Sequence, residues 1–174
     1  MVVVRWWGRL YLWKVKKGHL KIHFAVDVKT GQAVSMDVPS EKGGDGRRLK
    51  RLARRAEGSV RVRRVLADGA YDSKANFNFL AKERIRPVIR VAKNSVARCS
   101  GSYARKKAVI GQQAFRQKAW SRIHRFGYGW RVEGAFSVIK RIFGEYVTAR
   151  KFVNMAREVA MKASIYNGFI AAMA

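Results

Sequence analysis

The stretch VRRVLADGAYDSKANFNFLAKERIRPVIRV (residues 62–91) decides the fold of this 174-residue chain. Residues 62–67, which end in the apolar residues Val65, Leu66 and Ala67, are typical of a short buried strand that stops at Asp68. A helical pattern follows over residues 73–83, and a second apolar run at residues 87–91 predicts another strand. This order of strand, helix and strand predicts a β-α-β unit and therefore an α/β fold.

Upstream, residues 18–39 predict a β-hairpin. Apolar and polar residues alternate from Leu20 to Val28, which is the period of a half-buried strand. A turn with Gly31 follows, and a second strand stops at Pro39. A hairpin joined to a β-α-β unit predicts a mixed sheet.

The remainder of the chain divides into a basic excursion and two helices. Residues 92–130 lose periodicity, which predicts an inserted loop or excursion, and residues 131–143 and 152–170 have helical spacing. Residues 84–132 hold 13 Lys or Arg and no carboxylate. We expect a divergent segment at residues 1–16 and one domain at residues 17–174.

The charge predicts a polyanionic partner. Lys and Arg number 38 against 11 Asp and Glu, which gives a net charge of +27. A hydrophobic content of 48% argues against a disordered basic tail. The single Cys99 excludes an internal disulfide and a thiolate zinc site, which fits a reducing cytoplasm. No apolar run reaches the roughly 20 residues that span a membrane. Composition by itself favours a protein that merely coats RNA or DNA.

Two acids stand out against this basic background. Asp68 follows a strand, so it would project at the carboxyl edge of the sheet, where ligands bind in α/β folds. The alternative is that it only shapes an Asp-Gly turn. Glu133 lies in the helical stretch WRVEGAFSVIK, with Lys140 two turns further on the same face. The alternative there is an ordinary exposed helix.

These acids lie in blocks that resemble the DDE transposases of insertion sequences, of the IS4/IS5 type. The likeness covers roughly residues 17–168. It rests on KGHLKIHFAVDVKTG (17–31), LADGAYDS (66–73), WRVEGAFSVIKR (130–141) and YN (166–167).

The resemblance implies an RNase H-like α/β fold, in which helices flank a mixed sheet and a basic insertion precedes the last helices. It implies that Asp68 and Glu133 are the second and third metal-binding acids and that Lys140 belongs to the same catalytic signature. The cofactor would be Mg²⁺ or Mn²⁺. The implied function is DNA transposition by metal-dependent strand cleavage and transfer.

The implied partners are the terminal inverted repeats of an insertion sequence and the target DNA, in the nucleoid of the cytoplasm, with a homodimer as a further option. Trp120 and Trp130 flank the insertion and are candidates for DNA contact, with the alternative that they lie in the core or in an interface. The cations expected to contact DNA are Arg105, Lys106, Lys107, Arg116, Lys118, Arg122, Arg125 and Arg131.

The sequence also departs from the family pattern. The first catalytic Asp of the family precedes the hairpin, but residues 1–26 contain no acid, and Asp27 resembles a non-catalytic position. The family's Tyr and Arg before the Glu are Phe126 and Gly129 here, with Tyr128 and Arg131 close by as candidate substitutes. We therefore expect DNA binding with impaired cleavage. The alternative is a non-catalytic DNA- or RNA-binding protein or a domesticated remnant, and metal uptake separates the two.

Overall fold

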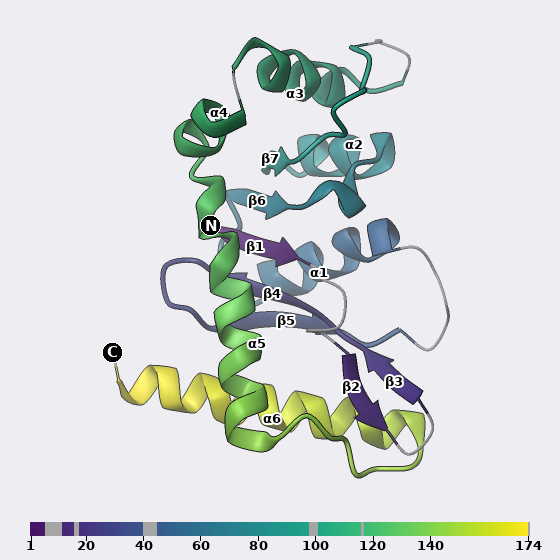
Figure 1. Ribbon diagram of the computed structural model, residues 1–174, viewed down its shortest axis with the longest axis vertical. Coiled ribbons are helices and arrows are strands. Elements are labelled where there is room, and N and C mark those ends of the chain that lie inside the picture. Colours follow the sequence, from purple (N-terminus) through teal and green to yellow (C-terminus); the bar gives the residue numbers. More distant parts are fainter. Residues whose placement is uncertain (6–11, 16–17, 40–44, 98–100, 116, 174) are drawn as a thin grey trace.

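The computed structural model describes residues 1–5, 12–15, 18–39, 45–97, 101–115 and 117–173 (Figure 1). The strands in this part of the chain are β1 (Val2–Arg5), β2 (Leu12–Val15), β3 (Gly18–Lys21), β4 (His23–Asp27), β5 (Ala33–Asp37), β6 (Arg64–Ala67) and β7 (Arg86–Ile89). The α-helices are α1 (Arg48–Glu57), α2 (Lys74–Lys82), α3 (Tyr103–Ala114), α4 (Gln117–Ile123), α5 (Trp130–Phe143) and α6 (Phe152–Ala172). The 3-10 helices are η2 (Asp45–Arg47), η3 (Gly69–Tyr71) and η4 (Phe126–Gly129).

Five strands form one mixed sheet in the order β5-β4-β1-β6-β7. β4 is antiparallel to β5 and β1, whereas β1, β6 and β7 run parallel. The predicted hairpin corresponds to β4 and β5, and the predicted β-α-β unit corresponds to β6, α2 and β7. The predicted strand from Leu20 to Val28 is interrupted at Ile22, so that β3 pairs with β2 in a separate small sheet. The α/β fold is confirmed.

Two apolar cores lie on opposite faces of the sheet. In β4, Phe24 belongs to one core and its neighbour Ala25 to the other, because successive side chains of a strand point to opposite faces. Phe136 of α5 packs in the first core, while Leu52 of α1 and Phe77 of α2 pack in the second. The pair α1 and α2 therefore covers the face opposite α5, and α6 lies beside β5 (Figure 1). Among the described helices, each is too short or too polar to cross a lipid bilayer.

The basic excursion is more regular than its sequence suggests. Residues 92–130 contain α3, α4 and η4, although no helical periodicity was expected there. Helix α3 begins at a capping serine, since the Ser102 hydroxyl accepts a hydrogen bond from the Arg105 N–H at 3.2 Å. Among the residues of α3, all of which the structure describes, only Val109 is buried. A helix that buries so little has no apolar stripe by which a sequence pattern reveals it.

The pair Tyr166-Asn167 holds α6 against the outer strand β5. The Asn167 amide accepts a hydrogen bond from the Ala33 N–H and donates one to the Ala33 C=O, both at 2.8 Å. The Tyr166 hydroxyl donates to the Gly31 C=O at 3.0 Å. Asn167 thus pairs with Ala33 as a neighbouring strand would, and it closes this edge of the sheet.

Replacing Asn167 by alanine should lower the free energy of unfolding by about 1–3 kcal/mol, because both backbone groups of Ala33 lose their partner. Urea denaturation measures the change. Asn154→Ala is the matched control, since Asn154 is exposed on the same helix. A loss for Asn167→Ala no larger than the loss for this control would contradict the edge-closing role.

Candidate active site

Asp68 lies at the carboxyl end of β6, as its position after the apolar run predicts. Its backbone is extended, and its Oδ1 accepts a hydrogen bond from the Ala70 N–H at 3.0 Å, which caps the short helix η3. Leu66 packs in the core beneath α5, whereas Ala67 packs in the opposite core. Because the alternation continues through the extended residue Asp68, Asp68 shares the α5 face of the sheet with Leu66.

Glu133 lies in the first turn of α5, where an acid also complements the helix dipole. One turn later, the buried Phe136 ring meets the Phe24 ring of β4, with 4.4 Å between the ring centroids. Helix α5 follows η4, which contacts β1 and β6, and then contacts β1, β4 and finally α6. The helix therefore crosses the sheet from the β6 side toward β5, so Glu133 lies on the β1 side of Phe136.

The register of the sheet gives the position of Asp68 relative to β1 and β4. Phe24 of β4 is paired with Arg5 of β1, and Val4 of β1 is paired with Ala67 of β6. The Arg5 backbone position is therefore next to Asp68. Asp68 thus follows β6 on the face of the sheet that α5 covers, and Glu133 lies in the first turn of α5 itself.

A third acid does not join them in the part of the chain that the structure describes, where no group of three or more His, Cys, Asp or Glu is placed to hold a metal. Carboxylate oxygens are the donors that Mg²⁺ takes, so the donor type of Asp68 and Glu133 suits a divalent cation. One Asp68 oxygen is already engaged by Ala70. The residues present therefore do not fit a fully ligated pair of metal ions.

Lys140 lies two turns after Glu133 on α5, as predicted. Its side chain is only 9% exposed, and its Nζ is 3.8 Å from Oε1 of Glu145. The ammonium group is thus held close to the protein surface beyond the end of the helix.

The predicted DNA-contacting cations have different surroundings. Arg105 donates from Nε and Nη2 to the two carboxylate oxygens of Asp72, at 2.7 and 2.8 Å. This hydrogen bonding raises the pKa of Arg105 although burial lowers it, and it ties α3 to the loop after β6. Lys106 and Arg131 are partly buried, and Arg116 lies outside the described residues. The exposed cations of this set are Lys107, Lys118, Arg122 and Arg125.

The two tryptophans that flank the insertion differ in exposure. Trp120 is only 4% exposed, and its ring packs against His124 and Phe126, with centroids 4.9 and 5.2 Å apart. Of the two alternatives, the structure therefore favours the core for Trp120, because a buried ring cannot stack on a base. Trp130 is 55% exposed and remains accessible.

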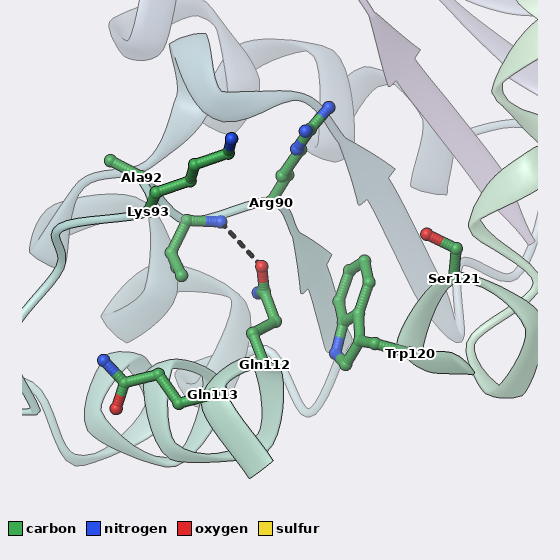
Figure 2. Close-up of a pocket in the computed structure, with 8 residues that line it drawn as sticks. Arg90, Ala92, Lys93, Gln112, Gln113, Trp120 and Ser121 are labelled. Atoms are coloured by element: carbon green, nitrogen blue, oxygen red, sulfur yellow. Dashed lines mark hydrogen bonds between the residues drawn. The ribbon is translucent and has the colours of Figure 1, made fainter. Parts of the chain in front are cut away.

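A hollow of about 200 Å³ lies between the end of β7 and the α3–α4 segment. Figure 2 shows Gln112 reaching from α3 to the chain after β7, with Trp120 beside it. The Gln112 amide accepts a hydrogen bond from the Val91 N–H at 3.0 Å and donates one to the Ile89 C=O at 2.8 Å. The basic excursion is thus anchored to the outer strand of the sheet, much as α6 is anchored to β5.

Sequence reasoning missed a second group of cations, at the amino ends of β6 and β7. Arg63 and Arg64 stand at the start of β6, and Arg64 is paired with Arg86 of β7. The run RVRR at residues 61–64 was a visible signal, but its pairing with Arg86 depends on the strand register.

A comparison with known protein families found a matching family model. A family model described as "Transposase DDE domain" matches residues 9–167, a range that includes Asp68, Glu133 and Lys140. No solved structure matches the chain. DDE transposases generally use divalent metals, and the family implies DNA as a partner. The chain therefore belongs to the transposase DDE domain family, which supports a function in transposition.

Proposed function

We propose that the chain is the catalytic domain of an insertion-sequence transposase of the IS4/IS5 type, and that its sheet is of the RNase H-like kind. The observation that supports the proposal is that Asp68 follows β6 on the face of the sheet that α5 covers, and that Glu133 lies in the first turn of α5. A mixed sheet that begins with a hairpin and continues through a β-α-β unit supports the fold assignment. The DNA partners would be terminal inverted repeats and target DNA.

Asp68 and Glu133 are the residues that would hold a divalent cation, Mg²⁺ or Mn²⁺. When bound, such a cation stabilises charge on the entering and leaving oxygens of a phosphodiester under attack. The chain's own contribution is to hold the two carboxylates on one face and to supply cations for the DNA strands. Lys140, two turns from Glu133, would belong to the same catalytic signature.

We further propose that cleavage by this chain is impaired. Residues 1–26 contain no Asp or Glu, and the β1 position next to Asp68 is Arg5. Two carboxylates offset less metal charge than three, so the metal should bind weakly. The proposed outcome is a protein that binds DNA well and cuts it slowly.

An assay of strand cleavage tests this function. The purified chain is incubated with Mg²⁺ or Mn²⁺ and a duplex that carries inverted-repeat ends. The amount of nicked product is compared with the amount that the Asp68→Ala variant produces. We expect weak cleavage that Asp68→Ala removes. Robust cleavage that Asp68→Ala abolishes would refute the impairment while supporting the catalytic role.

The second candidate function is DNA or RNA binding without catalysis, as in a domesticated remnant. It is favoured by the lack of a three-acid group among the described residues. Residual cleavage that is unchanged in both Asp68→Ala and Glu133→Ala, together with tight DNA binding, would establish this second function instead.

A further inference from the structure

A second concentration of positive charge lies at the amino ends of the parallel strands, away from Asp68. There a hollow of about 690 Å³ is lined by cations from several elements and by no carboxylate. We call it the basic hollow; its lining cations are Lys29, Arg63, Arg64, Arg125 and Arg131. In the described chain, none of these five side chains has an ion pair with an acid.

The arrangement is electrostatically unfavourable for the protein alone. Arg64 and Arg86 are directly paired across β6 and β7, and like charges in that position destabilise a sheet. Burial lowers the pKa of Arg64, and the charges of Arg86 and Arg125 lower it further. His124 nearby has its pKa lowered by burial and then by Arg86 and Arg64. Repulsion of this kind is relieved when an anion enters.

Arg131 adds an incompletely satisfied donor to the hollow. Its Nε is buried and has no hydrogen-bond partner among the described residues. Its guanidinium lies over the Trp130 ring, 4.8 Å from the centroid. A planar guanidinium held in this way is suited to phosphate oxygens.

We propose that the basic hollow binds the phosphodiester backbone of DNA at the edge of the sheet opposite Asp68. The choice of DNA as the occupant rests on the proposed function. Arg64 begins β6 and Asp68 follows its end, and the four residue steps from one to the other span about 13 Å. The domain would therefore contact DNA at a place distinct from the two acids.

The hollow continues into a second one, which favours a polymer over a single phosphate. The second hollow, of about 370 Å³, shares Arg125 and Tyr128 with the first and adds Arg122 and Trp130. Arg122 and Trp130 are exposed. A track with cations along its length and an exposed ring at one side suits a strand with several phosphates.

The test compares two double variants that remove the same charge. Arg63→Gln/Arg125→Gln changes exposed cations of the basic hollow, and Lys82→Gln/Arg157→Gln changes exposed cations on α2 and α6. Affinity for a fluorescent DNA duplex is measured by anisotropy over a range of salt concentrations. We expect the hollow variant to bind about tenfold more weakly near physiological salt, and its salt slope to fall by about 2, because each phosphate contact contributes about 0.9.

The control variant should keep its affinity within about twofold of the original. Equal losses in both variants would overturn the proposal, since they would show that the charge acts diffusely. Unchanged binding by the hollow variant would overturn it as well. If Arg63→Gln/Arg125→Gln fails to fold, Lys29→Gln/Arg63→Gln provides the same comparison.

A second arm distinguishes the DNA backbone from free phosphate. Thermal unfolding is recorded with inorganic phosphate for the original chain and the hollow variant. The backbone proposal would be overturned in favour of a free-phosphate site by two results together: phosphate raises the unfolding temperature of the original chain but not of the hollow variant, and the two proteins bind DNA with equal affinity. If the original chain binds no DNA, the result counts against the proposed transposase function. If the original chain binds DNA and the hollow variant binds it equally well, the result counts only against the basic hollow as the binding place.

Discussion

Phe136→Ala should lower the free energy of unfolding by about 3–5 kcal/mol, the range for removing a large aromatic side chain from a core. Phe136 is fully buried, and its ring meets the equally buried Phe24 ring at a centroid distance of 4.4 Å. The substitution removes the apolar burial and leaves a cavity between α5 and β4. A typical domain has only about 5–15 kcal/mol of stability, so the loss is a large part of the total.

Urea denaturation followed by circular dichroism measures this change. Ile142→Ala is the matched control, because Ile142 lies on the same helix but is 47% exposed. Its effect should stay within about 0.5 kcal/mol. A loss for Phe136→Ala below about 1 kcal/mol would show that α5 does not pack on β4 as described, and the placement of Glu133 would then fail as well.

The second large effect concerns the metal. Asp68→Ala and Glu133→Ala should each weaken Mn²⁺ binding by at least about tenfold, since each removes a hard oxygen ligand from a site with few of them. The free Mn²⁺ signal in electron paramagnetic resonance gives the affinity. Glu57→Ala, at an exposed acid of α1, removes the same charge away from the proposed site and should leave Mn²⁺ binding unchanged.

The same variants should retain DNA binding. Removing an acid from a chain of net charge +27 does not weaken its attraction to phosphate. Loss of DNA binding together with loss of Mn²⁺ binding in Asp68→Ala would instead indicate that Asp68 holds the fold of the turn after β6, where it accepts the Ala70 N–H.

The sheet was largely predictable because its signals are local. The alternation around Phe24 and the apolar residues before Asp68 each require only neighbouring residues, and β4 and β6 lie within the predicted strands, although the first predicted strand is interrupted at Ile22. Helix α3 was not predictable. Its buried face is reduced to Val109, and its position depends on the pairing of Arg105 with Asp72, 33 residues away in sequence.

The site was predictable in part for the same reason. Asp68 and Glu133 stand out by their immediate contexts. The position of Asp68 beyond β1 follows from the strand register, and the packing of α5 on β4 follows from the contact between Phe24 and Phe136. The basic hollow was missed because its members come from separate elements. Arg64 and Arg86 are 22 positions apart, and only the parallel pairing of β6 and β7 makes them neighbours.

The central claim is that Asp68 and Glu133 serve one cation. Its most direct test is Mn²⁺ binding by the Asp68→Ala/Glu133→Ala double variant, measured beside the two single variants. If the acids share a site, the double variant should lose little more affinity than either single variant, because the first substitution already dismantles the site. Losses that add fully, or single variants that bind Mn²⁺ as the original chain does, would contradict the account.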